Sequence, residues 1–345
     1  MTPLERKLAS FATRVESVLS EKLQNKREPE TIDPFVGYAT PDEVVVLGRV
    51  MSVLVSQNAE FGQSRLTNFR QMLQRFITSE VGGAQVSARE HVAVSDEEGY
   101  FKLTLPRDGR VGWVTIDVTL VANGSTTPCP VFIADPNAPV MVISDIDDTV
   151  MKTGAYSLAR NLWTSFTGNT LTRQVYADAA VLLHRLAETR GTPVYYVSSS
   201  PWNLHSFLQT VFERSSAIKG PMFLRDLGLS ETKLITNGHG NHKGDAIKTI
   251  MAANPSTDAI LLGDTGQKDA EVYHKAIQNH PGRIRAVVLR EPGPGPNRAT
   301  LNRMKQIEKA GVPVFSGPSF APFSDEVVGV AAAPRPVEQT QLRSV

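Results

Sequence analysis

The sequence contains very little cysteine and no long apolar run. Of its 345 residues only Cys129 is a cysteine, so the chain cannot form an intramolecular disulfide, and cysteine alone cannot build a zinc site. The most apolar stretch, residues 44–55, is interrupted by polar residues and is shorter than the ~20 residues that a membrane-spanning helix needs. Charged side chains interrupt residues 1–17, so we expect no secretory signal peptide. These absences favour a cytoplasmic protein without a transmembrane segment, one that at most attaches to a membrane surface.

The charge has no excess of either sign. Lysine and arginine together number 36 and aspartate and glutamate 35, which gives a net charge of +1. A protein that holds nucleic acid by bulk charge is normally more basic, so we expect no nucleic-acid partner. Hydrophobic residues make up 41% of the chain, as in an ordinary globular protein, which excludes disorder throughout the chain. The length corresponds to about two domains.

The N-terminal part is predicted to hold a helix, a linker and a β-rich domain. Between residues 4 and 23 apolar side chains recur every three or four positions, which predicts an amphipathic helix. This helix either docks on the body of the protein or is available to a membrane or a partner. We assign residues 1–33 to this helix and a polar linker. Residues 34–138 contain β-rich runs separated by turn signals, which predict a small sandwich-like accessory domain with one helical pattern near 65–77.

The pattern changes at about residue 139. The compact apolar runs VMVISD, VYYVSS, AILLGD and IRAVVLR are typical of strands that are buried on both faces. Helical patterns lie between these runs, and a further one at 297–310 precedes VPVF. The alternation of strand and helix over residues 139–317 predicts an α/β fold, a doubly wound parallel sheet with helices on both faces. Residues 318–345 show little periodicity and are predicted to be a flexible tail.

Carboxylates stand at the predicted ends of two of these strands. Asp145 and Asp147 end the first run, and Asp264 and Asp269 follow AILL. Ligands of open α/β sheets bind beyond the carboxyl ends of the strands, so we expect these side chains to converge. Clustered carboxylates repel one another unless a cation compensates. Because all the ligands are oxygens, and water and phosphate can complete the shell, the expected cation is Mg²⁺.

Donors and positive charge for a phosphate group are predicted at the same edge. Ser198 ends the second run, with Ser199 as the alternative hydroxyl, and Lys243 opens a later helix. The helix after Pro201 adds backbone N–H groups. Metal, lysine and donors together stabilise the charge on a phosphoryl group during its transfer. Trp202, just beyond, is expected to shape the wall of the pocket.

The motifs D-x-D-x-T, a serine, a lysine and an acidic pair occur here in the order found in the haloacid dehalogenase superfamily of phosphotransferases, which this sequence resembles. The longer strings SDIDDTVMKTG, YYVSSSPWNL and LLGDTGQKDAEVY are similar to Mg²⁺-dependent phosphatidate phosphatases related to the yeast actin-patch enzyme. The resemblance is strong over residues 139–290. It is weaker over GYATPDEVVVLGRV and DEEGYFKLTL, which look like the β-domain of bacterial relatives.

This resemblance implies roles for individual residues. Asp145 would be the nucleophile that forms an aspartyl-phosphate, and Asp147 would protonate the leaving alcohol and then activate water. Asp148 stands where many superfamily members carry glycine, and the phosphatidate phosphatases resemble this sequence there. The implied phosphate-binding residues are Thr149, Ser198, Ser199 and Lys243. The implied Mg²⁺ ligands are Asp145, the carbonyl of Asp147, Asp264 and, directly or through water, Asp269.

The spacing of the motifs leaves little room for a cap domain. Residues 150–197 separate the first two motifs and residues 199–242 the next two, and both gaps already contain predicted core helices. A cap of roughly 50 residues or more does not fit, so the expected fold is haloacid dehalogenase-like and Rossmannoid, without a large cap. An open site suits a phosphate carried by something large, such as a lipid headgroup. Residues 154–172 either form a flap toward the membrane or pack on the body.

Our leading interpretation is therefore a Mg²⁺-dependent phosphatidate phosphatase, a hydrolase of lipid metabolism that yields diacylglycerol and phosphate. Its partner would be a phospholipid substrate at a membrane surface. A phosphatase of a protein or of a soluble phosphomonoester is an alternative, because the same residues would bind the phosphate. A non-catalytic phosphatidate-binding module is a third possibility. The presence of both Asp145 and Asp147 argues against it.

Overall fold

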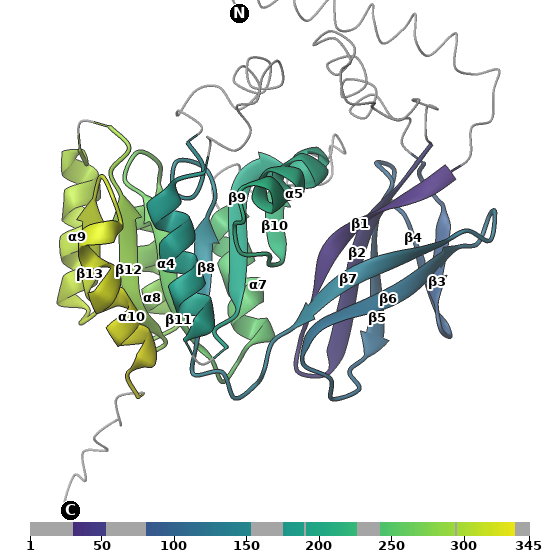
Figure 1. Ribbon diagram of the computed structural model, residues 1–345, viewed down its shortest axis with the longest axis horizontal. Helices are drawn as coiled ribbons and strands as arrows, with labels where there is room; N and C mark the ends of the chain where they lie inside the picture. Colours follow the sequence, from purple (N-terminus) through teal and green to yellow (C-terminus); the bar gives the residue numbers. More distant parts are fainter. Residues whose placement is uncertain are drawn as a thin grey trace, which may run out of the picture.

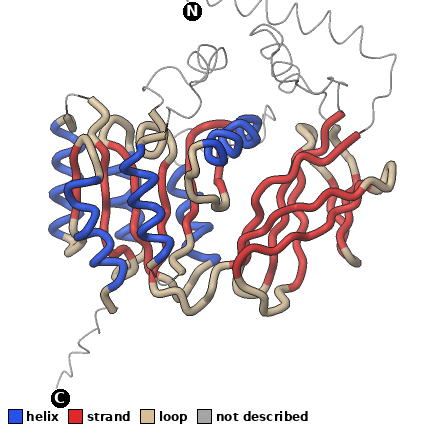
Figure 2. Tube along the Cα trace, in the orientation of Figure 1, coloured by secondary structure: helices blue, strands red, loops and turns tan. Residues whose placement is uncertain are grey.

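The structure is a computed structural model and describes residues 30–52, 81–152, 175–189, 191–225, 242–293 and 295–334. Two sheets lie side by side: an N-terminal sheet of seven strands and a C-terminal sheet of six strands that carries the helices (Figures 1 and 2). The predicted helices at 4–23 and near 65–77 and the segment 154–172 lie outside the described residues.

The N-terminal sheet has the strand order β4-β3-β6-β7-β1-β2-β5. Neighbouring strands are antiparallel except β1 and β7, which are parallel, so the sheet is mixed. All seven strands are hydrogen-bonded into one sheet, whereas the sequence predicted a sandwich-like domain. The two edge strands β4 and β5 also contact each other, so the sheet curls around a single apolar core. The strands are β1 (Glu30–Ala39), β2 (Glu43–Ser52), β3 (Gln85–Ala88), β4 (His91–Val94), β5 (Tyr100–Pro106), β6 (Gly112–Leu120) and β7 (Thr126–Ile133).

Strand β1 begins inside the stretch that the sequence assigned to a polar linker. Glu30 pairs with Ser52 and Thr31 with Met51, which places residues 30–33 in the ladder with β2. Ile32 is buried in the core of the sheet. The linker prediction is therefore wrong for residues 30–33, because cross-strand hydrogen bonds and the buried side chain of Ile32 stabilise these mostly polar first residues of the strand.

The C-terminal sheet has the strand order β10-β9-β8-β11-β12-β13, and all its strands are parallel. The five strands that the sequence predicted are all present, and β10 was not predicted. The α/β architecture with a parallel sheet is thus confirmed. The strands are β8 (Val140–Asp145), β9 (Val194–Pro201), β10 (Met222–Arg225), β11 (Asp258–Asp264), β12 (Ile284–Arg290) and β13 (Val314–Gly317).

Helices cover both faces of this sheet because alternate strand residues point to opposite sides. Val140 and Val142 point into the cluster with α4, α5 and α10, whereas Met141 and Ile143 point into the cluster with α7, α8 and α9. The second cluster also contains Tyr38 of the N-terminal sheet, so the two sheets share buried apolar contacts. The helices are α4 (Ala177–Glu188), α5 (His205–Arg214), α7 (His242–Ala253), α8 (Asp269–Asn279), α9 (Arg298–Lys309) and α10 (Ser324–Ala332).

Part of the predicted C-terminal tail is helical. A short 3₁₀ turn, Ala321–Phe323, leads into α10, which contacts α4 and β12. Phe320, Val327 and Ala331 are almost fully buried in the core of the C-terminal sheet. The prediction of a flexible tail over 318–345 is therefore wrong for residues 318–334, because burial of these side chains stabilises a helix that its weak sequence pattern did not indicate. Residues 335–345 lie outside the described part of the chain.

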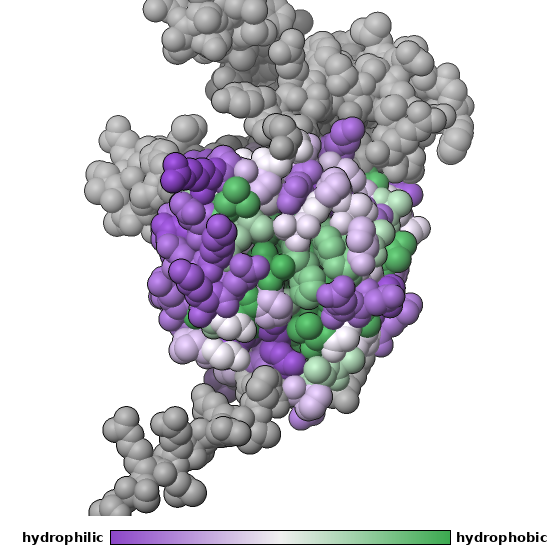
Figure 3. Space-filling view, turned by 90° about the vertical axis from the view of Figure 1, so that its left-hand side faces the viewer, coloured by the Kyte–Doolittle hydropathy of each residue, from purple (hydrophilic) through white to green (hydrophobic). Residues whose placement is uncertain are grey.

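The face formed by α9, β13 and α10 carries a band of apolar surface between strongly polar areas (Figure 3). Strand β13 is the edge of the parallel sheet here, and Leu301 on α9 is exposed. Within the described ranges, no helix is both long and apolar enough to span a membrane.

Candidate active site

The chain makes a tight turn where β8 ends at Asp145. The N–H of Asp148 donates to the carbonyl of Met151 at 2.7 Å, and the N–H of Val150 donates to the carbonyl of Ile146 at 3.0 Å. Asp148 has a φ of 58°, in the left-handed region that glycine adopts freely and aspartate tolerates better than most residues. Glycine would adopt this backbone conformation without steric cost. The turn places Asp145 and Asp147 at the carboxyl edge of the sheet.

Asp145 forms an ion pair with Lys243, the second residue of α7. The distance from Lys243 Nζ to Asp145 Oδ1 is 2.8 Å, and that from Nζ to Asp269 Oδ1 is 2.5 Å. Thr149 Oγ1 donates to the other oxygen of Asp145, Oδ2, at 3.1 Å. Asp145, Lys243 and Asp269 are all buried. Thr149 and Lys243 therefore contact Asp145, and Asp269 joins the same cluster through Lys243. The sequence predicted that these residues converge.

The absence of a side chain at Gly263 lets Asp269 approach the end of β11. A Cβ atom at residue 263 would lie 2.5 Å from Asp269 Oδ2 and 2.7 Å from the hydroxyl of Tyr273. Real Cβ contacts do not come this close, so a larger residue would displace Asp269. In the structure Asp269 Oδ2 accepts a hydrogen bond from the N–H of Asp264 at 3.1 Å.

Asp147 is held by two hydroxyls from β9. Ser198 Oγ donates to Asp147 Oδ2 at 2.6 Å, and Ser200 Oγ donates to the same oxygen at 3.1 Å. The N–H of Ser200 also donates to Ser198 Oγ at 2.9 Å. Ser199 is exposed and is not part of this cluster, because successive residues of a strand point to opposite faces. The structure thus brings Ser198 and Ser200 to Asp147, whereas the sequence prediction named Ser198 and Ser199.

Asp264, at the end of β11, accepts two backbone hydrogen bonds on one oxygen. The N–H groups of Gly266 and Gln267 donate to Asp264 Oδ1 at 2.7 and 2.8 Å. Gln267 also bridges to the first motif, because its Nε2 donates to the carbonyl of Asp147 at 3.3 Å. The second oxygen of Asp264, Oδ2, and Oδ1 of Asp147 are buried and have no hydrogen-bond partner within the described chain.

These carboxylates fit a hard divalent cation. Asp145, Asp264 and Asp269 each offer an oxygen, and the three atoms lie within 4.8 Å of one another. A buried oxygen without a donor is costly unless a cation or a ligand satisfies it, and Asp264 Oδ2 and Asp147 Oδ1 are two such atoms. Oxygen-only donor sets suit Mg²⁺ or Ca²⁺ rather than zinc or copper. The predicted convergence of the carboxylates is thus present, and its chemistry suits the predicted metal.

Burial and mutual repulsion raise the pKa values of the clustered carboxyl groups. Burial is the largest cause for Asp145, whose pKa lies well above its ordinary value although Lys243 opposes the shift. Burial followed by repulsion from Asp269 raises the pKa of Asp264 to about 7. The pKa of Asp147 is also raised by burial, against the hydrogen bonds from Ser198 and Ser200. A bound cation would remove this repulsion and favour the ionised carboxylates.

Burial opposes the charged form of Lys243, but the attraction of Asp145 and Asp269 outweighs it, and the pKa of Lys243 is raised. The ammonium group therefore stays charged at neutral pH. It supplies one positive charge to the cluster and is fixed in position by two carboxylates on different elements.

Arg290, the last residue of β12, contacts the turn that carries the D-x-D-x-T motif. Its Nε donates to the carbonyl of Thr149 at 3.0 Å, and its Nη2 donates to both carboxylate oxygens of Asp178 at 3.1 Å. The guanidinium lies between the rings of Tyr176 and Phe320, with its carbon 3.9 and 4.2 Å from the ring centres. Arg290 is fully buried, so these contacts fix the turn that carries Asp145 and Asp147.

Ser200, Gln267 and Arg290 were not predicted from the sequence as residues of the site. Ser200 had a usable signal, because it lies two positions after Ser198 and strand residues two apart share a face. Gln267 and Arg290 had none, since their roles depend on contacts between elements that the sequence does not specify.

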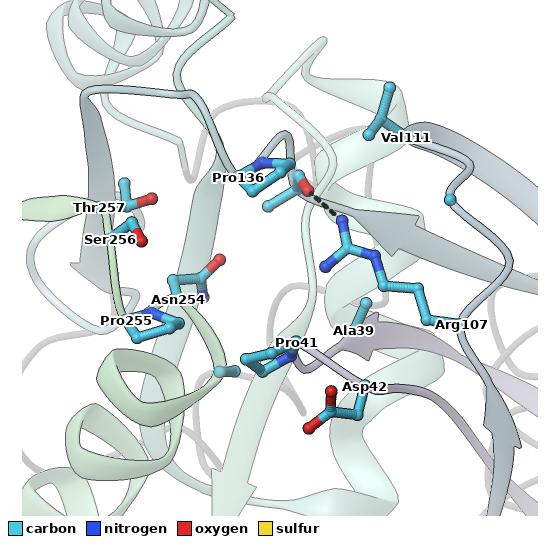
Figure 4. A pocket seen from close by; sticks show the side chains of 13 residues that line it. Ala39, Pro41, Asp42, Arg107, Val111, Pro136, Asn254, Pro255, Ser256 and Thr257 are labelled. Atoms are coloured by element: carbon cyan, nitrogen blue, oxygen red, sulfur yellow. Dashed lines mark hydrogen bonds between the residues drawn. The ribbon is translucent and has the colours of Figure 1, made fainter.

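A pocket of about 570 Å³ lies at the opposite edge of the sheet, between the N-terminal sheet and the turn that precedes β11 (Figure 4). Arg107, Asp42, Asn254 and Ser256 are among the residues that line it. Strand β11 begins after this turn and ends at Asp264, so the length of the strand separates the pocket from the carboxylate cluster. The pocket is therefore not part of the candidate active site.

Comparison with known proteins gives a family for this region. Residues 140–291 match the family described as phosphatidate phosphatase APP1, catalytic domain. Phosphatidate phosphatase APP1 of Saccharomyces cerevisiae is 27% identical over 149 residues, which cover 43% of this chain and 25% of that protein. An uncharacterized protein of Schizosaccharomyces pombe is 24% identical over 153 residues, which cover 44% of this chain and 25% of that protein. The resemblance predicted from the motifs is thus confirmed: this region is a relative of the APP1 catalytic domain.

The matched region spans about a quarter of the length of these curated relatives. Among solved structures, the flavohem-like FAD/NAD binding domain of nitric oxide dioxygenase from Vibrio cholerae O1 biovar El Tor aligns over 77% of this chain and 100% of that chain. The alignment has 10% identity and a TM-score of 0.19, which is too low to inform the fold.

Proposed function

We propose that this chain is a phosphoric monoester hydrolase with a doubly wound, haloacid dehalogenase-like catalytic unit, and that its substrate is phosphatidate. The observation that carries the proposal is the cluster at the carboxyl edge of the sheet. There Asp145 contacts Lys243 and Thr149, and Asp147 contacts two serine hydroxyls. Asp145 as nucleophile, Asp147 as proton donor and Lys243 as a fixed positive charge lie together at the carboxyl edge of the sheet. Phosphoryl transfer through an enzyme carboxylate requires these three groups.

In the first step a carboxylate oxygen of Asp145 attacks the phosphorus, and the bond from phosphorus to the alcohol oxygen breaks. The leaving oxygen takes its proton from Asp147, and the product on the enzyme is an aspartyl-phosphate. In the second step water attacks the phosphorus while Asp147 accepts a proton from that water. The bond from Asp145 to phosphorus breaks, inorganic phosphate leaves, and both carboxyl groups return to their starting forms.

The environment of Asp147 suits both halves of this cycle. Burial raises its pKa, which favours the protonated form needed to protonate the leaving alcohol. Ser198 and Ser200 stabilise the ionised form by hydrogen bonding, which favours the base that the second step needs. Burial and these hydrogen bonds thus act in opposite directions on the protonation of Asp147.

Mg²⁺, when bound, would neutralise charge on the phosphoryl oxygens. Asp145, Asp264 and the carbonyl of Asp147 would hold it, and Asp264 Oδ2 is buried and without a donor in the described chain. Both oxygens of Asp269 already accept hydrogen bonds, from Lys243 and from the N–H of Asp264. Asp269 would thus orient Lys243 and help to hold the metal, directly or through water.

Phosphatidate is favoured as the substrate because the matched family and the yeast relative are both described as phosphatidate phosphatase. The reaction would yield diacylglycerol and phosphate at the surface of a membrane, with the protein acting from the cytoplasm. A soluble phosphomonoester is the second candidate, because Ser198, Lys243 and the carboxylates would contact only the phosphate group of either substrate.

The test is the release of inorganic phosphate from phosphatidate in mixed micelles, measured with Mg²⁺ and with EDTA, beside soluble phosphomonoesters. We expect release that depends on Mg²⁺ and is faster with the lipid. Release from soluble esters alone would leave the chemistry in place and exclude the lipid. No release from any monoester would contradict the proposed activity.

A further inference from the structure

The loop that holds Asp147, residues 198–206, also contacts the N-terminal sheet. Ser198 and Ser200 end β9, and Trp202 follows two residues later in a 3₁₀ turn, Trp202–Leu204. The indole of Trp202 stacks on the ring of Phe35 in β1, with ring centres 5.2 Å apart and planes inclined by 9°. Phe35 is only 3% exposed, so a side chain of the N-terminal sheet is buried against the end of this loop.

Two more contacts join the same short segments. The rings of Phe35 and His205 have centres 4.1 Å apart, and Ser206 Oγ donates to Asp33 Oδ2 at 2.6 Å. His205 is 1% exposed, and neither of its ring nitrogens has a hydrogen-bond partner in the part of the chain that the structure describes. Its ring therefore acts as a packing group against Phe35 and, at 5.9 Å between ring centres, Trp202. Residues 33–35 thus contact residues 202–206 at three places.

The helical turns that follow Pro201 begin without side-chain caps. Neither the 3₁₀ turn nor α5 has a side-chain hydrogen bond at its N-cap, since Pro201 and Leu204 occupy those positions. A helix start without a cap is less stable than one with a serine, threonine, aspartate or asparagine cap. The contacts with β1 supply the restraint that the missing caps would otherwise give.

We propose that β1 positions the phosphate-binding loop of the catalytic unit, with Phe35 as the positioning residue. Phe35 fixes Trp202 and His205, and these fix the backbone that carries Ser198 and Ser200 against Asp147. The proposal rests on the proposed function, because it assigns phosphate binding to this loop. The N-terminal sheet lies outside the matched residues 140–291, and the proposal gives it a role in positioning the catalytic residues.

The same interface offers a matched control. Tyr38, three residues further along β1, packs on Phe223 of β10 with ring centres 5.1 Å apart. Tyr38 is buried like Phe35 but contacts neither Trp202 nor His205 through its ring. Beyond Tyr38, β1 ends at Ala39, which lines the pocket at the far edge of the sheet (Figure 4). Loss of either ring weakens the interface, but only loss of the Phe35 ring frees the loop.

The experiment compares Phe35→Ala and Tyr38→Ala in the full chain, with Phe35→Leu as a milder variant should Phe35→Ala fail to fold. We expect Phe35→Ala to weaken inhibition by inorganic phosphate and to raise KM for a soluble phosphomonoester, each fivefold or more. Tyr38→Ala should change both less than twofold at a similar loss of stability against urea. Equal effects of the two variants, or an unchanged phosphate affinity in Phe35→Ala, would overturn the proposal.

Hydrogen–deuterium exchange separates this proposal from the proposed function. We expect faster amide exchange over residues 198–206 in Phe35→Ala and no change there in Tyr38→Ala. Unchanged exchange in Phe35→Ala would overturn the positioning role even in an active enzyme. If the wild-type chain released no phosphate from any monoester, the proposed function would fail, and exchange in the two variants would still decide whether β1 positions the loop.

Discussion

Ser198 and Ser200 both donate to one oxygen of Asp147, and Ser199 between them is exposed. The motif in the sequence indicated that a hydroxyl is needed at this strand end, but not which of three consecutive serines supply it. The two-residue period of a strand settles the choice once one contact is known. Ser198 and Ser200 share a face, and Ser199 belongs to the other.

At this scale we predict that Ser200→Ala lowers kcat on the order of tenfold, because a hydrogen bond to a charged group contributes about 1.5–3 kcal/mol. Loss of this donor should also raise the pKa of Asp147 further, so the alkaline limb of the pH profile of kcat/KM, where Asp147 loses the proton that it gives to the leaving alcohol, should move to higher pH. Ser199→Ala is the control and should stay within twofold of wild type. A loss in Ser199→Ala as large as that in Ser200→Ala would contradict this assignment.

Most residues of the site could be predicted from the sequence, because each stands at the end of an apolar run or the start of a helical pattern. Asp145, Asp147, Asp264, Lys243 and Asp269 all lie at the predicted edge. Arg290 could not be predicted, because an arginine at the end of a strand is ordinarily exposed. Its burial depends on Asp178, Tyr176 and Phe320, which come from other elements.

Among the elements, the long buried strands of the C-terminal sheet and the short strand β13 were predictable, whereas β3, β4 and β10 were not. Strands such as β8 and β11 are buried along their whole length and read as continuous apolar runs. Strands β3, β4 and β10 have four residues each, too few for a clear period. Tertiary packing, rather than local pattern, stabilises these elements and α10.

For α10 we predict that Val327→Ala lowers the free energy of unfolding by about 1–3 kcal/mol, as expected for a cavity left by a smaller buried side chain. Val327 is fully buried against the core of the C-terminal sheet. Glu326→Ala, one residue earlier and exposed, should change it by less than about 0.5 kcal/mol. The measurement is urea unfolding of both variants. An unchanged midpoint in Val327→Ala would mean that α10 does not pack in solution as described.

On the scale of the whole molecule, the two sheets are joined by buried rings rather than by a flexible connection alone. Phe35 and Tyr38 of β1 contact Trp202, His205 and Phe223 of the C-terminal unit. The sequence indicated a β-rich unit ahead of the catalytic one. It could not indicate this interface, because isolated aromatic residues in a strand are equally typical of a core.

The interface predicts a pH dependence of stability. Burial lowers the pKa of His205 from 6.5 to about 3, so the folded protein holds the neutral ring while the unfolded chain takes up a proton below about pH 6.5. Stability from this residue is complete above pH 6.5 and is lost as the pH falls toward 3. Between pH 7.5 and 5.5 the loss should be about 1.4 kcal/mol.

The check is urea unfolding of wild type and His205→Phe at both pH values. The phenylalanine variant keeps an aromatic ring in the stack and cannot be protonated, so its loss of stability between pH 7.5 and 5.5 should be smaller than that of wild type by about 1 kcal/mol. An identical pH dependence in the two proteins would show that His205 is not buried against Phe35 in solution.

The most direct test of the central claim is the rate of Mg²⁺-dependent phosphate release by the wild type and by Asp145→Asn, measured side by side on phosphatidate and a soluble phosphomonoester. Lys243 keeps its contact with Asp269 in this variant, so we expect the circular dichroism spectrum and the unfolding midpoint to show a folded protein. The account predicts a loss of activity of roughly a thousandfold or more, because the amide cannot act as the nucleophile. Asp145→Asn that remains folded and retains a substantial part of the wild-type rate would contradict the assignment of the nucleophile.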